Sequence, residues 1–479
     1  MKGLAAGGLA VVLLGACGGG PPTPDFGRLY NAAASGIGDD RTPVIVIPGI
    51  LGSKLEDMDS SRPVWGSFTY GAVDADTPEG AAAVALPMRE NVPLSELTDE
   101  VRPTGVLDSV TADIGFVRNL KIGAYADILF TLAAGDYADE DIIENAGIDY
   151  GGHYTCYQLA YDWRRDVSES AALLHQRVLD AQAAIRSATG LSGDEPVKVD
   201  VVAHSMGGLL LRYYLRYGPQ PLPEDGSLPE LTWEGARHVE RAVLIATPNA
   251  GSVESTVQLV EGLNLNPLFP NYRPGVLGTM PSIYQLMSRP RHARVVDQRG
   301  EPIDLYDSAV WERYGWGLAA ADQDRVLGWL LPGFDDPAAR RRIALDHLRK
   351  CLAKARQFHA ALDVPASPPE GLELFLFAGD AIDTPVVVTV DDRGRPSVTE
   401  LGPGDKTVPR TSTLMDERVG GGYAPYLRSP IDWTQIFFLH ASHLGLTRDP
   451  AFVDNLLYLL LEKPRGGATA PELIGEARR

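Results

Sequence analysis

The chain has 479 residues, of which 44% are hydrophobic and 22% charged, a composition that fits a folded globular protein and not a disordered one. Acidic residues outnumber basic ones by 63 to 43, which gives a formal net charge of −20. Since no cluster of Lys and Arg forms a groove for phosphates, we expect no nucleic-acid partner, and any membrane contact must come from apolar surface or a covalent lipid.

The first residues are typical of a cleaved export signal. A basic residue precedes an apolar stretch at residues 4–14, which is too short to span a bilayer comfortably. The stretch ends in Leu-Gly-Ala-Cys, which resembles the bacterial lipobox and implies a signal peptide at residues 1–16, a lipid on Cys17 and a tether at residues 17–40. We therefore expect a membrane-anchored lipoprotein of the bacterial cell envelope that faces outside the cytoplasm. The alternative is an ordinary secretory signal with a chance cysteine.

Two cysteines remain after export into an oxidising compartment, Cys156 and Cys351. One disulfide between them is possible, but their spacing carries no signal for it. We therefore expect two buried free thiols.

Strand and helix patterns alternate along most of the chain. They predict strands at residues 42–47, 154–163, 197–203 and 239–246. Between these strands, they predict helices at residues 124–134, 168–188 and 207–217. The framework resumes with strands at residues 372–378 and 385–390 and closes with an apolar helix at residues 450–461. This alternation predicts a mainly parallel central sheet with helices on both faces.

Two segments interrupt this framework and are predicted to be cap insertions. Residues 57–121 are irregular and rich in Gly, Pro and acidic residues, and residues 252–369 include a charged helical stretch at residues 338–362. Within the second insertion, the apolar walls of a substrate site are expected at residues 263–287, with the aromatic residues Phe269, Tyr272 and Tyr284. The alternative is that these residues pack the cap on the core.

A serine stands where a predicted strand turns directly into a helix. Residues 203–207 read Ala-His-Ser-Met-Gly, which matches the nucleophile elbow of the α/β-hydrolase fold in all but the first glycine. The tight turn strains the backbone and projects the Ser205 hydroxyl from the sheet, and the small Ala203 still fits. The sequence therefore predicts Ser205 as a nucleophile on an α/β-hydrolase fold with cap insertions.

The serine hydroxyl needs a base within hydrogen-bond reach and an acid that orients this base. In this fold the histidine comes last along the chain, and only His440 and His443 follow the last predicted strand. We prefer His443, which immediately precedes the C-terminal helix, and interpret His440 as a packing or surface residue. The pair also suggests metal ligation, but no third ligand stands at a suitable spacing, so no metal is expected.

Asp380 and Asp405 are the alternatives for the acid. Asp380 ends a predicted strand, and Asp405 lies in Pro-Gly-Asp-Lys-Thr-Val-Pro beyond a hairpin. Either can reach the imidazole, and an Asp after a strand is often only a turn former. Spacing alone leaves the choice open.

Acyl transfer also needs two backbone N–H groups that bind the oxyanion of the tetrahedral intermediate. The N–H of Met206 is one of them. The other is expected after the first strand, in Pro-Gly-Ile-Leu-Gly-Ser, where Gly49 and Gly52 free the backbone around Ile50. A plain turn is the alternative interpretation.

Taken together, six motifs resemble the lecithin:cholesterol acyltransferase family, which includes lysosomal phospholipase A2 and the phospholipid:diacylglycerol acyltransferases. In chain order they read PVIVIPGILGSKLE, AYDWRRD, AHSMGG, TPNAGS, GDKTVP and SHLGL. They are spread over residues 42–461, and their order is more specific than the elbow alone. The resemblance implies an α/β-hydrolase domain at residues 41–463 and a C-terminal tail at residues 464–479.

The resemblance makes Ser205 the nucleophile, Asp405 the acid and His443 the base. It also places the two oxyanion N–H groups at Ile50 and Met206. The implied reaction is acyl transfer from a phospholipid or other lipid ester to an alcohol or to water, with no cofactor. The triad does not decide between the two acceptors.

Some residues depart from the family or lie outside its chemistry. Residues 161–164 (Tyr-Asp-Trp-Arg) are implied to be scaffold in which a charged pair holds loops together, and Asp380 becomes the second choice for the acid. Residues 57–121 contain no cysteine, so the disulfide-stapled lid of the mammalian members has no counterpart here. Lys406 replaces a glycine next to the acid, which changes the loop and leaves the carboxylate in place.

Two other functions are compatible with these residues. The first is a carboxylesterase or depolymerase that acts on non-lipid esters, which would not favour long acyl chains. The second belongs to another class, a non-catalytic envelope lipoprotein with a vestigial hydrolase fold. Such a protein would not react with a fluorophosphonate probe.

Overall fold

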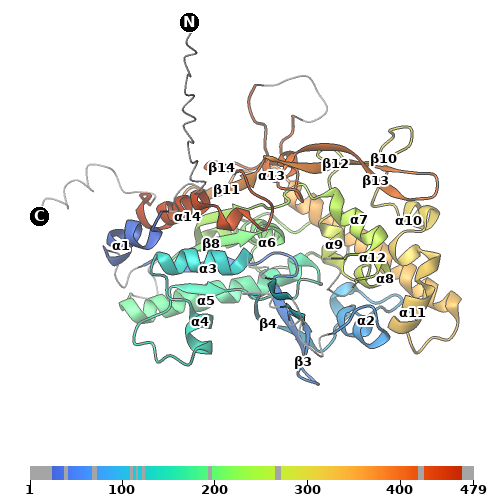
Figure 1. Ribbon diagram of the computed structural model, residues 1–479, viewed down its shortest axis with the longest axis horizontal. Coiled ribbons are helices and arrows are strands. Elements are labelled where there is room, and N and C mark those ends of the chain that lie inside the picture. The colour runs from blue at the N-terminus through green and yellow to red at the C-terminus, as the bar shows by residue number, and fades with distance from the viewer. Residues whose placement is uncertain are drawn as a thin grey trace, which may run out of the picture.

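A six-stranded parallel sheet forms the centre of the molecule (Figure 1). The computed structural model describes residues 24–36, 41–66, 73–107, 112–114, 117–120, 124–191, 197–264, 271–418 and 425–465. The sheet has the order β14-β11-β9-β8-β1-β7 and consists of β1 (Val44–Ile47), β7 (Cys156–Gln158), β8 (Val199–His204), β9 (Val239–Ile245), β11 (Glu373–Gly379) and β14 (Gln435–Leu439). The predicted parallel sheet is therefore confirmed.

The central strands are short and apolar because the sheet is buried on both faces. Along β1, Ile45 and Ile47 join one hydrophobic cluster, whereas Val44 and Val46 join the other. Successive side chains of a strand point to opposite faces, so the two clusters lie on opposite sides of the sheet. The first is covered by α5 (Ser170–Thr189) and α6 (Met206–Tyr217), and the second by α3 (Ala124–Ala134) and α14 (Pro450–Leu457).

Helices of the second insertion gather on one side of the molecule, away from α14 (Figure 1). They are α7 (Val253–Glu261), α8 (Pro274–Leu277), α9 (Pro281–Gln285), α10 (Ser308–Tyr314), α11 (Asp324–Leu330) and α12 (Pro337–Asp363). The last of them is the predicted charged helix. It begins at Pro337, where the missing N–H costs nothing, and the Asp336 side chain caps its first turn.

A second sheet stands beside these helices, in the order β10-β12-β13, with β10 (Arg294–Asp297), β12 (Ile382–Val390) and β13 (Pro396–Gly404). The strand predicted at residues 385–390 lies in this sheet and not in the central one, so its assignment to the framework was wrong. The reason is the two-residue link between Gly379 and Ile382. A parallel neighbour needs a crossover of a dozen or more residues, so β12 must leave the central sheet.

The first insertion contains regular structure that the sequence did not indicate. Strands β2 (Ser53–Asp57), β3 (Arg62–Trp65) and β4 (Val101–Val106) form an antiparallel sheet, and α2 (Pro78–Val84) follows β3. The segment predicted as a tether contains α1 (Phe26–Gly36). This helix docks on α14 through the Tyr30 hydroxyl, which donates to the Asp454 backbone oxygen at 2.8 Å. Smaller elements are α4 (Glu140–Asn145), α13 (Arg410–Leu414), β5 (Ala112–Ile114) and β6 (Val117–Leu120).

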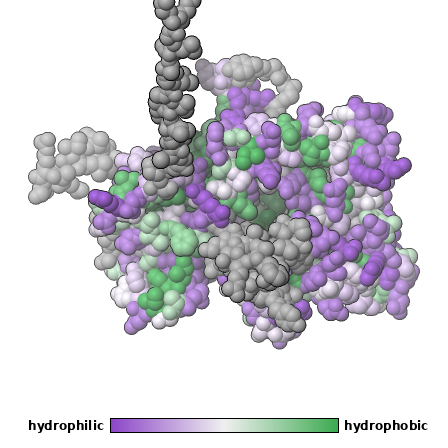
Figure 2. Space-filling view, viewed as in Figure 1, coloured by the Kyte–Doolittle hydropathy of each residue, from purple (hydrophilic) through white to green (hydrophobic). Residues whose placement is uncertain are grey.

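The surface in Figure 2 is mostly hydrophilic, with separate hydrophobic patches, as the net charge of −20 leads one to expect. None of the helices in the described residues is long and apolar enough to cross a membrane. Cys156 and Cys351 are both buried and free. The predicted signal peptide and Cys17 lie outside the described residues, so their assignment stays a prediction.

Candidate active site

Ser205 occupies a sharp turn between β8 and α6. Its backbone has φ 53° and ψ −125°, a strained conformation for a residue with a side chain. The turn needs small neighbours, because a Cβ added to Gly207 would lie 2.4 Å from the Pro48 carbonyl oxygen. One added to Gly208 would lie 1.9 Å from Thr247 Oγ1. The local sequence therefore explains why the serine is held at the carboxyl end of the sheet.

The Ser205 hydroxyl donates a hydrogen bond to the Nε2 atom of His443, with 3.0 Å between the two atoms. His443 lies on the loop between β14 and the short helix at Leu446–Arg448. Strand β14 was not predicted from the sequence, although the loop was. His440, the alternative, is exposed, and the serine hydrogen-bonds to His443 instead.

The Nδ1–H of His443 donates to Asp405 Oδ2 at 2.8 Å. The other carboxylate oxygen of Asp405 accepts the backbone N–H groups of Thr407 at 3.0 Å and Val408 at 2.7 Å. Asp405 is fully buried. Asp380 instead lies 3.8 Å from Arg410, so the structure brings Asp405 and not Asp380 to the imidazole.

The loop after β1 lies directly over the serine. A Cβ added to Gly49 would lie 2.8 Å from the Cβ of Ser205, so only glycine permits this approach. The loop is fixed from outside, since the Gly49 N–H donates to the Tyr125 hydroxyl at 2.9 Å and the Tyr161 hydroxyl donates to the Pro48 carbonyl at 2.9 Å. The following residue, Ile50, is partly exposed.

Two backbone N–H groups beside the serine are open to a ligand. In the described part of the chain, no loop or turn carbonyl accepts the N–H of Ile50 or of Met206. Met206 is the first residue of α6, where the N–H groups have no intrahelical acceptor and the helix dipole is positive. The N–H groups of Ile50 and Met206 therefore stay candidates for binding an oxyanion, as expected from the sequence.

The charges around His443 favour an imidazolium. Burial by itself lowers the pKa of His443, but the Asp405 carboxylate and its hydrogen bond outweigh burial and raise this pKa above 6.5, and Glu254 adds to the rise. The pKa of Asp405 is lowered although burial opposes this, because the His443 charge and hydrogen bonds stabilise the carboxylate. Asp405 therefore stays ionised, and His443 gains a proton readily.

Three neighbours of the triad were not predicted from the sequence. His204 donates from Nε2 to the His443 carbonyl at 3.1 Å, and burial together with the nearby His443 lowers its pKa to about 3, so it stays neutral. Tyr125 lies edge-on to His204, with 5.6 Å between the rings. Glu254 is the second residue of α7, and burial raises its pKa. His204 and Glu254 had a local signal, because His204 lies within the motif AHSMGG and Glu254 stands two residues after the motif TPNAGS.

The aromatic residues expected as walls of a substrate site are buried in packing instead. Tyr272 lies against Trp65 with 5.9 Å between the rings, and Tyr284 against Trp311 with 5.6 Å. Both tyrosines are at most 2% exposed. The alternative interpretation, that they pack the cap, is therefore the one that the structure supports. Phe269 lies outside the described residues.

Residues 140–287 match the sequence model of the family described as Lecithin:cholesterol acyltransferase. The match confirms the resemblance to this family. It includes the elbow with Ser205 and Met206, whereas Ile50, Asp405 and His443 lie outside it. No curated protein sequence gives a significant match.

A solved structure shares the fold at low sequence identity, and others align more weakly. The crystal structure of the Tle4–Tli4 complex aligns with a TM-score of 0.57 and 14% identity, over 88% of this chain and 98% of that one. Bacillus licheniformis lipase BlEst2 in its propeptide form aligns at 0.32 and 10%, over 90% and 52%. Phospholipase PlaB from Legionella pneumophila aligns at 0.32 and 14%, over 70% and 57%. The predicted α/β-hydrolase fold is confirmed.

The segment Tyr-Asp-Trp-Arg at residues 161–164, which the family resemblance assigned to scaffold, holds two loops together. The Arg164 guanidinium is fully buried and contacts carboxylate oxygens of Asp162 at 2.8 Å and Asp99 at 3.0 Å. Asp99 belongs to the first insertion, so the ion pair joins this insertion to the loop after β7. Because this guanidinium is buried and paired with two carboxylates, it is not available to contact a substrate.

Lys406, which stands where the family has glycine, has φ 84° in the left-handed region. A side chain is disfavoured there, so we expect Lys406→Gly to raise the free energy of unfolding by about 1 kcal/mol. Urea denaturation measures the change. Asn91→Gly is the matched control, because Asn91 is exposed with φ 59° and asparagine tolerates this conformation. An unchanged or lower stability of Lys406→Gly, with the control unchanged, would show that Lys406 is not strained.

The raised pKa of His443 determines the acid limb of the pH profile. The base must be neutral to accept the serine proton, so kcat/KM is expected to rise with pH through an ionisation above 6.5 and to fall below it. Glu254→Gln removes a negative charge near the imidazole and should move this ionisation to lower pH. The exposed Asp335 provides the control Asp335→Asn, which should leave the profile unchanged. An upward shift in Glu254→Gln contradicts the prediction.

Proposed function

We propose that this protein is a serine-dependent acyl hydrolase or acyltransferase that acts on lipid esters through an acyl-enzyme on Ser205. The observation that carries the proposal is the chain of hydrogen bonds from Ser205 to His443 and from His443 to Asp405. These three residues lie far apart in the sequence. The family match supports an enzyme that acts on lipid esters in general. Leu444, the residue after the base, is a large exposed apolar side chain.

In the first half of the reaction, the Ser205 oxygen attacks the ester carbonyl while His443 Nε2 takes the hydroxyl proton. Asp405 stabilises the imidazolium that results. The carbonyl oxygen becomes an oxyanion, which the N–H groups of Ile50 and Met206 stabilise. The intermediate then collapses, the bond to the leaving alcohol breaks, and His443 returns its proton to that alcohol.

In the second half, another nucleophile releases the acyl group. His443 takes a proton from water or from an alcohol, whose oxygen attacks the acyl-enzyme carbonyl. Collapse of the second intermediate returns the proton to Ser205 and releases a fatty acid or a new ester. The same residues serve both outcomes, so the acceptor depends on how well the cap excludes water.

The test gives the purified protein mixed vesicles of a labelled phospholipid and a long-chain or sterol alcohol, and identifies the products by mass spectrometry beside Ser205→Ala. New acyl esters would identify an acyltransferase, and free fatty acid with lysolipid a phospholipase. A parallel series of simple esters separates the alternatives, because a lipid enzyme should favour long acyl chains. If the folded protein turns over neither the vesicle lipids nor the simple esters, the non-catalytic alternative is the one that remains.

We also propose that a lipid on Cys17 anchors the protein in an envelope membrane, with the catalytic domain outside the cytoplasm. The lipobox-like Leu-Gly-Ala-Cys supports this location. Cys17→Ser should move the protein from the membrane fraction to the soluble fraction, since the thiol carries the only expected anchor. Cell fractionation and immunoblotting measure the change. A protein that stays in the membrane unchanged contradicts the anchor.

A further inference from the structure

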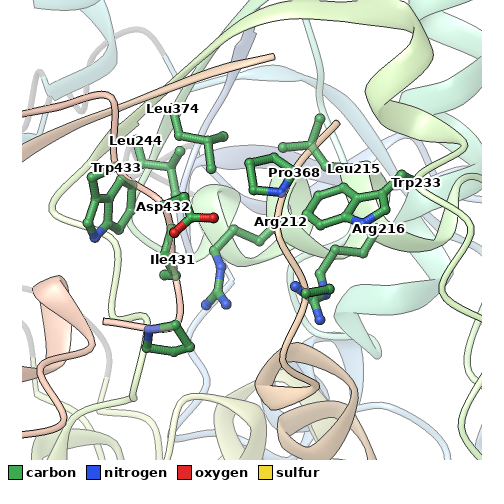
Figure 3. Close-up of a pocket in the computed structure, with 12 residues that line it drawn as sticks. Arg212, Leu215, Arg216, Trp233, Leu244, Pro368, Leu374, Ile431, Asp432 and Trp433 are labelled. Atoms are coloured by element: carbon green, nitrogen blue, oxygen red, sulfur yellow. The ribbon is translucent and has the colours of Figure 1, made fainter. Parts of the chain in front are cut away.

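A pocket lies beside the C-terminal half of α6 (Figure 3). Most of its apolar residues belong to the hydrophobic cluster on the sheet face opposite α3 and α14. Its walls come from α6, from Trp233 in the segment before β9, from the loop that follows α12, from β9 and β11, and from the segment that precedes β14. The cavity is small, about 30 Å³, and opens to solvent. Most of its lining is apolar, with Trp233 and Trp433 on opposite sides and Leu374 and Pro368 between them. The mechanism at Ser205 uses none of these residues.

Two cations lie inside this apolar lining. Arg212 and Arg216 are one helical turn apart on α6, so their side chains share one face of the helix. They are only 6% and 5% exposed. Among the residues that the structure describes, no carboxylate oxygen lies within 4.0 Å of either guanidinium. Both cations are therefore buried without a direct counter-ion.

Neutral groups accept hydrogen bonds from only some of the N–H donors of the two guanidinium groups. Arg212 donates to Asn249 Oδ1 at 3.2 Å and to the Leu362 carbonyl at 3.1 Å. Arg216 donates to the Val364 carbonyl, and its guanidinium lies 5.3 Å from the centre of the Trp233 ring. The Nε of Arg216 is buried and has no partner in the described chain. Arg216, which lines the pocket, thus has an unused buried donor.

The end of α12 accounts for some of this charge but not for all of it. The carbonyls of Leu362 and Val364 lie at its C-terminus, where the helix dipole provides about half a negative charge. Asp363 lies nearby but pairs with Arg289 at 3.2 Å. Two full positive charges therefore exceed the negative charge around them, and burial together with Arg216 lowers the pKa of Arg212 to about 9.

We propose that this pocket binds a monocarboxylate with an apolar body, whose carboxylate lies on the Arg212 and Arg216 guanidinium groups between the two indole rings. A planar guanidinium edge matches a carboxylate, and the apolar walls favour an attached hydrocarbon over a fully hydrated anion such as phosphate. Asp432, exposed at the rim, is the acidic residue of the lining and would weaken binding of anions with a second charge. The fatty acid that ester hydrolysis releases belongs to this class, but binding does not depend on the reaction at Ser205.

Octanoate is a suitable probe, because it combines one carboxylate with an apolar chain. Its binding to the full chain carrying Ser205→Ala can be followed by calorimetry and by quenching of tryptophan fluorescence, beside octanol and inorganic phosphate. We expect saturable binding of octanoate that is at least about tenfold tighter than that of octanol, since a charge-assisted hydrogen bond is lost with the alcohol. Equal binding of octanoate and octanol, or tighter binding of phosphate, would overturn the proposal.

Three variants locate the site. Arg216→Gln should weaken octanoate binding about tenfold or more and Arg216→Lys by less, because Lys keeps the charge and loses the planar edge. Asp432→Asn should strengthen binding, and this rim residue keeps the test decisive if a change at Arg216 impairs folding. The exposed Arg299 supplies the control Arg299→Gln. If a folded Arg216→Gln binds octanoate as tightly as the parent, the anion binds elsewhere and the pocket is not its site.

Discussion

Replacing Ser205 with alanine should abolish labelling by a fluorophosphonate probe and lower kcat on a lipid ester by about 10⁶-fold. The serine oxygen is the only group that contacts His443 Nε2 in the described residues, and the alanine leaves no nucleophile at the elbow. A Cβ already occupies this position in Ser205, so the turn and α6 should fold as before. Labelling is read on a gel by fluorescence, and kcat from fatty acid release.

His443→Ala tests the same contact from the other side. It should lower kcat by a similar factor and should not add to the effect of Ser205→Ala, because the two residues act as one unit. The exposed His440 provides the matched control, since His440→Ala removes a second histidine of the same loop. If His440→Ala abolishes activity and His443→Ala does not, the base has been wrongly assigned. Residual labelling of Ser205→Ala would point to a different nucleophile.

The central framework could be predicted because its signals are local. The β-branched run before Pro48 and the apolar spacing in α5 are visible within a few residues of sequence, and both elements are in place in the structure. Strand β14 was not predicted because it is a short edge strand of five residues, only one of which is buried. Its partner β11 lies far away in sequence, and only that pairing makes it a strand.

The choice between two acids could not be made from spacing for a geometric reason. Both lie at the carboxyl end of β11, since Asp380 follows the strand directly and a Cβ on Gly379 would lie 2.6 Å from the Cβ of Asp405. The hairpin of β12 and β13 returns the chain to the same place, as the bridge between Ile382 and Asp405 shows. Nothing in the local sequence encodes this return, so the motif of the family had to decide.

The pocket at Arg212 was even harder to predict from the sequence than the acid. Its lining residues are spread over residues 212–433 in several separate segments, and each segment looks ordinary alone. Two arginines on one helix face usually lie on a solvated surface. Only the burial of both side chains in the structure distinguishes this pair as a candidate binding site. Because the sequence pattern does not show that the two arginines are buried, it does not predict a binding site there.

The second large effect is expected at Asp405. Asp405→Asn keeps the size of the side chain and an oxygen that accepts from Thr407 and Val408, so the loop should stay in place. An amide nitrogen that faces His443 Nδ1 forces the proton onto Nε2, and the base then cannot accept the serine proton. We expect kcat to fall about 10⁴-fold, with little change in the thermal midpoint of unfolding.

Asp380→Asn separates this role from a general loss of charge at the same edge of the sheet. Asp380 contacts Arg410 at 3.8 Å and not the imidazole, so its variant should keep a kcat close to that of the parent. The pH profile gives a second readout. With the Asp405 carboxylate gone, the cause that raises the pKa of His443 is removed, and the remaining activity should lose its acid limb above 6.5. If Asp380→Asn is the inactive variant and Asp405→Asn is active, Asp405 only caps its own turn and Asp380 orients the base during turnover.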